Sequence, residues 1–258
     1  MPREGGAHTG VDLIRRGWRM VDDPGRCDDG TYADTLGGIS YPPGVAGISD
    51  SPRETQRRAV FQTRIHGRGG QGVVTAAELL SVAAFGAGKH AQAFPSFGSE
   101  RTGAPVVAYC RIADEQIRNR EPILVPDALI VQDATLLNQV DLLSGLPTDG
   151  YLLVNTRHSL LTIGLQEFAA AHRPERIVTV AATDLALKYL GRPVPNAVLL
   201  GGFAALTGMV SLDGVQGAVL ERFPGATGEA NAAAAAAAYA DVHEQLATWR
   251  DSADATTD

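Results

Sequence analysis

The sequence predicts an α/β protein with a three-layer, Rossmann-like, mainly parallel sheet, helices on both faces and a helical C-terminal part. Short apolar runs alternate with helical runs from residue 60 onward, which is typical of parallel sheets built from strand–helix–strand units. A glycine-rich turn joins the first apolar run to the first helical run. After Pro195 every remaining pattern is helical.

The expected strands are short and apolar. The first covers Val60 to Ile65 and the second covers Pro105 to Ile112. Three further runs are continuously apolar, as in strands buried on both faces, and lie at 128–131, 152–155 and 177–181. Their alternation with helical segments favours a sheet that is mainly parallel.

Helices are expected at 73–86, where Gly86 and Gly88 end the pattern, and later at 196–209, 212–222 and 231–249. The last of these contains the alanine run 232–238, which strongly favours helix. Because small side chains let backbones approach closely, this run suits a seam between two helices or between two subunits.

Three regions are expected along the chain. Residues 1–58 are rich in glycine and proline, carry charges of both signs without periodicity, and predict an extended, largely irregular N-terminal arm. Its Trp18 and Tyr41 are either anchors for a partner or parts of an unstructured tail. Residues 59–250 form the α/β domain, and 251–258 form a flexible tail.

Composition excludes several classes of function. The formal net charge of −7 disfavours nucleic acid as a partner. No apolar run reaches the length of a membrane span or a signal peptide, so no membrane is expected and the predicted location is cytoplasmic. Cys27 and Cys110 cannot supply the four thiolates of an iron–sulfur cluster. Cys110 lies in an apolar strand and is expected to be a buried, unreactive residue.

The densest motif is a glycine-rich segment made up of Gly67, Arg68, Gly69, Gly70, Gln71 and Gly72. A strand, a glycine loop and a helix N-terminus together place backbone amides around an anionic group. The spacing satisfies G-x-G-x-x-G, but the carboxylate that a dinucleotide site needs about 20 residues later is missing. Val73 and Val74 replace the lysine and hydroxyl of a phosphoryl-transfer loop. Neither an NAD site nor phosphoryl transfer is therefore expected.

A second dense stretch covers residues 91–105 and is expected to be a loop. It carries two exposed aromatic residues, Phe94 and Phe97, beside the charged pair Glu100 and Arg101. Such a loop is costly in water unless something covers it. It is expected to dock on a partner or cover a ligand, and the alternative is a surface turn with its rings tucked into the local core.

No catalytic set emerges from the remaining polar residues. Asp133, Asn155 and Thr156 follow strands at the end where parallel sheets bind ligands. All three are expected to act as ordinary helix N-caps. His66 adjoins the glycine loop without a nucleophile beside it, and the other histidines lack metal-ligand spacing. The chain is therefore expected to complete an active site that belongs to another subunit.

Several segments resemble one known family. Residues 64–80 resemble the opening of the gamma subunit of 2-oxoacid:ferredoxin oxidoreductases, and residues 93–106 resemble the second signature of that family. The Phe-Pro-Ser-Phe-Gly form of the second signature is similar to the pyruvate and ketoisovalerate branch. Residues 126–133 and 195–201 also fit, so the resemblance extends over roughly residues 60–225.

The resemblance implies an accessory subunit that is not catalytic alone. Enzymes of this family convert a 2-oxoacid, here expected to be pyruvate, and CoA to acyl-CoA, CO2 and reduced ferredoxin. Thiamine diphosphate, Mg²⁺ and 4Fe–4S clusters are implied for the complex, mainly on the alpha, beta and delta subunits, and no cofactor is expected on this chain alone. The implied partners are those subunits and, through them, ferredoxin.

The resemblance also implies a set of residues that contact CoA or a neighbouring subunit: Gly67, Arg68, Gly69, Gly70, Gln71, Gly72, Lys89, Ser96, Glu100 and Arg101. The loop amides with Arg68, and with Lys89 or Arg101, are candidates for a CoA phosphate. The glycines equally suit close packing against a partner. Two other functions stay open at this point: a free-standing Rossmann-like nucleotide-binding or regulatory module, and an NAD-linked relative of the oxidoreductase.

Overall fold

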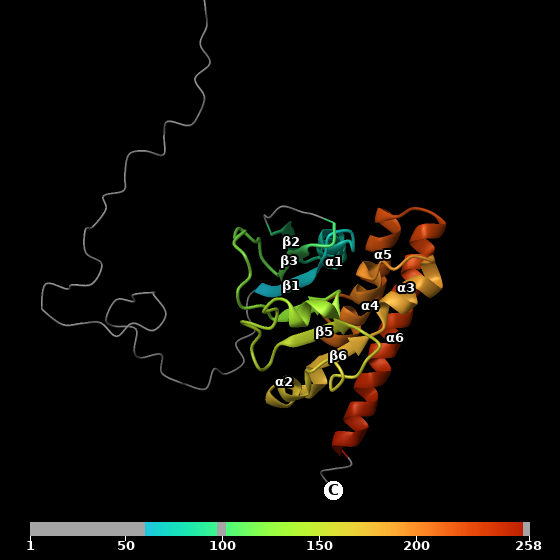
Figure 1. The fold of residues 1–258 in the computed structure, drawn as a ribbon. Coiled ribbons are helices and arrows are strands. Elements are labelled where there is room, and N and C mark those ends of the chain that lie inside the picture. Colours follow the sequence, from blue (N-terminus) through green and yellow to red (C-terminus); the bar gives the residue numbers. More distant parts are fainter. Residues whose placement is uncertain (1–59, 97–101, 255–258) are drawn as a thin grey trace, which may run out of the picture. The chain divides into compact units, whose positions relative to one another are not determined.

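The computed structural model describes residues 60–96 and 102–254. These residues fold around one six-stranded sheet with the strand order β2-β3-β1-β4-β5-β6 (Figure 1). The predicted N-terminal arm and the last four residues of the predicted tail lie outside the described residues. The same holds for Phe97, Glu100 and Arg101 in the second signature.

The sheet is mixed, with one reversed strand. Its members are β1 (Val60–Arg68), β2 (His90–Pro95), β3 (Pro105–Ala113), β4 (Ala128–Val131), β5 (Tyr151–Asn155) and β6 (Ile177–Val180). Strands β1, β4, β5 and β6 pair in parallel, while β3 pairs antiparallel with both β1 and β2. The predicted mainly parallel sheet is confirmed. The three continuously apolar runs are β4, β5 and β6, of which β4 and β5 are central and β6 is an edge strand.

Strand β2 corrects the prediction of a loop at 91–105. Its residues pair with β3 as far as Pro95, opposite Ala108. The ring of Phe94 is half-buried against Tyr109, with ring centroids 5.1 Å apart, and the Arg111 guanidinium lies 5.0 Å from its centroid. The prediction that Phe94 is exposed was therefore wrong. Its hydrophobic surface is covered by the neighbouring strand.

Strand β1 is longer than predicted. Gly67 and Arg68 pair with Val106 and Pro105 of β3 and so belong to the strand, not to the loop. The glycine loop between β1 and α1 is consequently shorter and covers Gly69 to Gly72.

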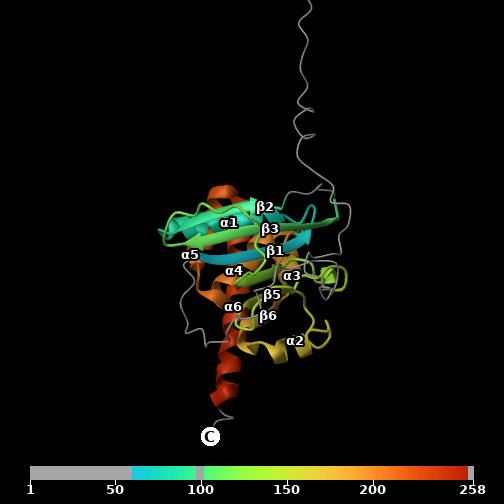
Figure 2. The same cartoon turned by 90° about the vertical axis from the view of Figure 1, so that its left-hand side faces the viewer.

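Five helices cover one face of the sheet: α1 (Val73–Gly86), α3 (Ala182–Leu190), α4 (Asn196–Thr207), α5 (Leu212–Arg222) and α6 (Ala226–Asp254). The strands lie in front of α4, α5 and α6 in Figure 2. The other face carries α2 (Gln166–Ala171) and two short 3-10 helices, η1 (Ala134–Asn138) and η2 (Pro174–Arg176). Each face has its own apolar core, which confirms the three layers.

Two predicted helices match the structure to the residue, namely α1 and α5. Helix α6 begins before the predicted residue 231 and continues to Asp254, into the segment predicted as a tail. Its alanine run packs against α4. A Cβ atom added at Gly201 would lie 1.9 Å from the carbonyl oxygen of Ala235. The run therefore forms a seam between two helices of the same chain.

A buried arginine fixes two loops on the thinner face. The Arg64 guanidinium on β1 donates to the carbonyl oxygens of Leu142 and Ser144 at 2.6 and 2.7 Å. It also lies 3.4 Å from the carbonyl oxygens of Ile123 and Leu124. Burial lowers the pKa of Arg64, although Tyr109 and Asp141 oppose that effect. Four backbone acceptors, without a paired carboxylate among these contacts, hold the guanidinium.

The topology defines one crevice at the sheet. From β1 the chain crosses through α1 to β2 on one side, whereas β4 leads through η1 to β5 on the other. The connections after β1 and β4 therefore diverge at the carboxyl ends of these adjacent strands. This divergence is the position where open α/β sheets bind ligands. No helix in the described part of the chain is long and apolar enough to cross a membrane.

Candidate functional site

The two dense sequence motifs meet at the carboxyl end of β1. The amide of Gly69 donates to the carbonyl of Ala104 at 2.9 Å, and the amide of Gly103 donates to the carbonyl of Gly69 at 3.0 Å. Ser96 follows β2 at the same end of the sheet, and its side chain is exposed. The glycine loop and the end of the second signature therefore form one continuous surface.

The glycines of the first motif serve different purposes. A Cβ atom at Gly67 would lie 2.6 Å from Cγ2 of Val73, and one at Gly72 would lie 2.4 Å from Nδ2 of Asn196. Gly67 thus lets α1 pack against the end of β1, and Gly72 lets the start of α4 pack against the start of α1. Gly70 has a φ of 95° but no neighbour within 4 Å of an added Cβ. It is the open point of the loop.

Arg68 is held by contacts within the chain. Its Nε donates to Oδ2 of Asp133 at 3.0 Å, and its Nη1 donates to the carbonyl of Gly103 at 3.1 Å. Its Nη2 donates to Oγ1 of Thr135 at 2.7 Å and to Oε1 of Gln139 at 2.9 Å. We call this set the Arg68 clasp. It joins β1, η1 and the second signature, and leaves the guanidinium little capacity for a ligand.

Asp133 is the acidic centre of the clasp and the N-cap of η1, as predicted. Its Oδ1 accepts from the amide of Thr135 at 3.0 Å, and its Oδ2 accepts from Nε2 of Gln71 at 3.0 Å. Burial alone would raise the pKa of Asp133. The hydrogen bonds from Thr135 and Gln71, together with the charge of Arg68, outweigh that effect and lower the pKa.

The N-terminus of α1 faces the loop without a cap. Its N-cap residue, Gly72, has a φ of 72° and no side-chain hydrogen bond, and the first turn contains no acidic residue. The first amides of a helix have no acceptor inside the helix and carry the positive end of its dipole. The charge of Arg68 is paired with Asp133, so the first amides of α1 are the unpaired positive end at this edge of the sheet.

Two buried polar residues lie beneath the loop, and the sequence predicted a site role for neither of them. Gln132, at the end of β4, is 1% exposed, and neither atom of its side-chain amide has a partner in the described residues. His66 on β1 is 8% exposed and its Nε2 likewise has none. Burial, followed by the charge of Arg64, lowers the pKa of His66 to about 4. In the sequence, only the position of these two residues at the ends of predicted strands indicates that they lie near a site.

Asn155 and Thr156 do not cap the helix that follows them. Asn155 reaches a later helix: its Oδ1 accepts from the amide of Thr183 at 3.1 Å and its Nδ2 donates to Oγ1 of Thr183 at 2.8 Å. Thr156 accepts from the amide of His158 in a turn. The prediction that these residues cap the next helix was wrong, because that helix, α2, begins only at Gln166, after a long turn.

Lys89 lies apart from the other candidates. It follows α1 at the end opposite the glycine loop, and its ammonium group pairs with the carboxylate of Asp114. The structure therefore brings together Gly67 to Gly72 and Ser96, but not Lys89. Glu100 and Arg101 lie outside the described residues.

The described part of the chain offers few side chains for metal binding or thiol chemistry. Burial raises the pKa of the Cys110 thiol to about 12, so it is the inert, buried residue that was predicted. Among residues 60–96 and 102–254 no group of three or more His, Cys, Asp or Glu residues could hold a metal ion. These residues do not fit an iron–sulfur cluster.

Comparison with known proteins identifies the family. A profile described as pyruvate ferredoxin/flavodoxin oxidoreductase matches residues 62–240, which include the crevice and most of the helical layer. The chain belongs to the pyruvate ferredoxin/flavodoxin oxidoreductase family. The relatives named below confirm the resemblance of the sequence motifs to the gamma subunit.

Named relatives within this family agree. The pyruvate synthase subunit PorC of Methanothermobacter marburgensis is 49% identical over 180 residues, which cover 70% of this chain and 96% of the relative. The common gamma subunit of the pyruvate/ketoisovalerate oxidoreductases of Thermococcus kodakarensis is 47% identical over 180 residues, which again cover 70% of this chain and 96% of the relative. The crystal structure of PORC from Thermotoga maritima, with 37% identity, has a TM-score of 0.60 and covers 70% and 96% of the two chains. The chain is thus a gamma-type subunit of an oxidoreductase.

Proposed function

We propose that the chain serves as the gamma subunit of an enzyme that converts pyruvate and CoA to acetyl-CoA, CO2 and reduced ferredoxin. The match to a pyruvate synthase subunit and to a pyruvate/ketoisovalerate oxidoreductase gamma subunit, each covered over 96% of its length, supports this proposal. Thiamine diphosphate, Mg²⁺ and the iron–sulfur clusters belong to alpha-, beta- and delta-type partner subunits in a cytoplasmic complex. A free-standing nucleotide-binding module is not favoured, because the matched relatives are subunits.

Within the complex, the crevice between β1 and β4 contacts a phosphate of CoA. The support for this role is the uncapped start of α1, with Gly70 open to solvent and no acidic residue in the first turn. Backbone amides at such a position bind phosphate groups. The Arg68 clasp contributes by fixing the loop, and the other candidate residues at this edge, Gln71 and Ser96, lie beside it.

Assembly is tested first. The chain is tagged, purified anaerobically from its own cells and measured by native mass spectrometry. Larger subunits that carry thiamine diphosphate and iron–sulfur clusters are expected to co-purify, and pyruvate with CoA is expected to reduce those clusters. A lone monomer or homodimer would contradict the proposed function.

The CoA contact is tested with a charge pair at Gly70. The variants Gly70→Asp and Gly70→Asn impose the same backbone strain, since both place a side chain at a φ of 95°. They differ by one negative charge. In the purified complex, Gly70→Asp is expected to raise the KM for CoA at least about fivefold above that of Gly70→Asn. Equal KM values would remove the phosphate from this loop while leaving subunit membership intact.

A further inference from the structure

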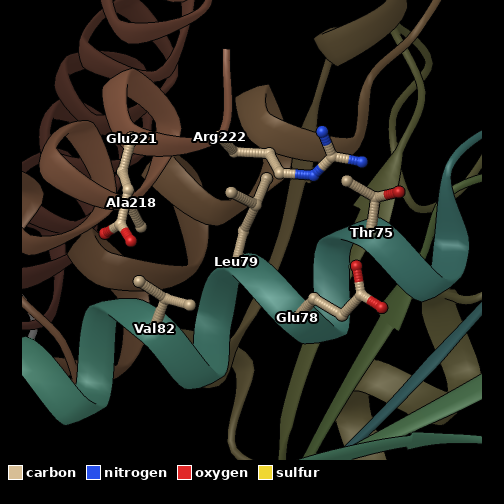
Figure 3. A pocket seen from close by; sticks show the side chains of 7 residues that line it. All are labelled: Thr75, Glu78, Leu79, Val82, Ala218, Glu221 and Arg222. Carbon is tan, nitrogen blue, oxygen red and sulfur yellow. The ribbon is translucent and has the colours of Figure 1, made fainter. Parts of the chain in front are cut away.

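A small groove separates α1 from α5 on the outer surface of the helical layer (Figure 3). The two helices are close at Gly214, where an added Cβ would lie 3.3 Å from the carbonyl oxygen of Ala83. Nearer the start of α1 they leave a cavity of about 140 Å³. Leu79 and Ala218 form part of its lining and are almost fully buried.

The apolar surface continues beyond the groove. Val82 lines the groove and is 40% exposed. Phe85, three residues later on the same face of α1, is 73% exposed. Large apolar side chains that gather beside a cavity indicate a surface for a protein partner. None of these residues belongs to the crevice described above.

The rim of the groove is acidic. Glu78 comes from α1 and Glu221 from α5, and Arg222 is the cation among the lining residues. In Figure 3 the Arg222 guanidinium extends over Leu79 toward Thr75. Among the residues that the structure describes, no ion pair is made by Glu78 or Glu221. Two carboxylates thus border an apolar cavity and remain available to cations.

We infer that this groove seats one apolar side chain from a basic segment of another subunit of the oxidoreductase. The cavity has the scale of a single leucine or phenylalanine side chain, and an apolar anchor inside a charged rim is a common plan of protein interfaces. The inference rests on membership of a multisubunit family and does not depend on the CoA contact.

A second copy of the chain fits the groove less well. In a two-fold contact the same surface meets itself, so the carboxylates of Glu78 and Glu221 would face each other across the interface. Like charges placed together in this way oppose association. The net charge of −7 acts in the same direction. A lysine- or arginine-bearing segment next to an apolar residue has the complementary chemistry.

The groove also adjoins the crevice. Thr75 lines one end of it and lies three residues after Gly72. A partner segment in the groove would therefore lie along α1 and reach toward the glycine loop. Docking would fix α1, whose N-terminus forms one wall of the crevice.

Photo-crosslinking in the intact complex identifies the occupant. A benzoylphenylalanine residue is introduced at Val82 and, as a control, at Leu187 of α3, which is 47% exposed. Cross-links from position 82 are expected to reach a segment of another subunit with Lys or Arg within a few residues of an apolar side chain. Cross-links only to a second copy of this chain, to an acidic segment, or to nothing would overturn the inference.

Charge reversal tests the chemistry of the rim. Glu78→Lys and Glu221→Lys are compared with Glu244→Lys, which lies exposed on α6. The two groove variants are expected to bind the remaining subunits at least about tenfold more weakly, whereas the control binds normally. Reversing the cross-linked Lys or Arg to Glu should restore binding. Groove variants with wild-type affinity and wild-type circular dichroism would refute the proposed charge complementarity.

Discussion

Nε of Arg68 lies 3.0 Å from Oδ2 of Asp133, and this contact joins the end of β1 to the cap of η1. Both side chains are largely buried, with exposed fractions of 22% and 16%. The guanidinium is shared among four acceptors, while the carboxylate accepts from three side chains. The pair therefore organises the loop that carries the candidate site.

Replacing Arg68 by lysine is expected to destabilise the protein although it preserves the charge. One ammonium group cannot reach the carbonyl of Gly103, Thr135 and Asp133 in the geometry of the guanidinium fork. The expected loss is about 1–3 kcal/mol in the free energy of unfolding, measured with urea. Arg157→Lys, at an exposed ion pair, should change stability by less than about 0.5 kcal/mol. Equal effects at the two positions would contradict the clasp.

Asp133→Asn is expected to destabilise the protein most at neutral pH. Because the folded-state pKa of Asp133 is lowered, its stabilising contribution is present above the unfolded-state pKa and disappears as the pH falls through the folded-state pKa. The difference between wild type and variant should therefore shrink from pH 7 toward pH 3. Asp241→Asn, exposed on α6, is the control. A difference that stayed constant over this range would show that Asp133 is not stabilised as a carboxylate.

His66 predicts a loss of stability in weak acid. Its pKa is about 4 in the folded protein and about 6.5 when unfolded, so the unfolded chain binds the proton first. Stability should fall as the pH drops from 6.5 toward 4, by about 2 kcal/mol between pH 7.5 and 5. His66→Gln should remove that part of the pH dependence, and the exposed His158→Gln should not. The free energy of unfolding is measured with urea at the two pH values for the wild type and both variants. The same change with pH in all three proteins would disprove the role of His66.

Arg64→Leu is expected to cost about 3–5 kcal/mol of stability, because it leaves buried carbonyl oxygens of two loops without a donor. Arg64→Lys should recover only part of that loss, since one ammonium group cannot span both loops. The midpoint of urea unfolding measures both variants, with the exposed Arg157→Leu as control. Full recovery by lysine would mean that charge, and not the planar fork, matters at this position.

Gly201→Ala should separate α4 from α6. The new methyl group would lie 1.9 Å from the carbonyl oxygen of Ala235, which is backbone and cannot rotate away. A loss of about 2 kcal/mol or more is expected from the thermal unfolding curve. The matched change Gly217→Ala on α5 meets no atom within 4 Å and should be neutral or slightly stabilising. Loss of stability at both positions would point to helix propensity and not to the seam.

Local chemistry explains which elements could be predicted. Helix α1 is flanked by Gly72 at its start and Gly88 after its end, both at positive φ. Because glycine is the residue that favours such positions, these helix ends can be predicted from the sequence. The run 128–131 is continuously apolar because β4 is covered on both faces. In each case the signal comes from neighbouring residues and does not depend on the rest of the fold.

The predictions that were wrong or left open concern residues whose contacts lie far away in the sequence. Strand β2 looks like a loop because His90 to Pro95 is polar and aromatic in sequence, and only its pairing with β3 makes it a strand. Asn155 looks like a local cap, but its partner Thr183 lies 28 residues away. The role of Arg68 was ambiguous because a guanidinium beside a glycine loop suits a phosphate as well as a carboxylate. The carboxylate of Asp133 comes from the segment that follows another strand, β4, 65 residues along the chain.

The place of helix α6 in the core affects how the protein folds during its synthesis. Its residues from Ala232 to Val242 belong to the same core as α1 and β1, and it contacts α3, α4 and α5. Until α6 leaves the ribosome, the faces of α4 and α5 that pack on it are uncovered, and a nascent chain exposes them to aggregation and to chaperones. Only a chain synthesised through α6 can therefore present finished surfaces to the other subunits. The order of synthesis itself then acts as a check before assembly.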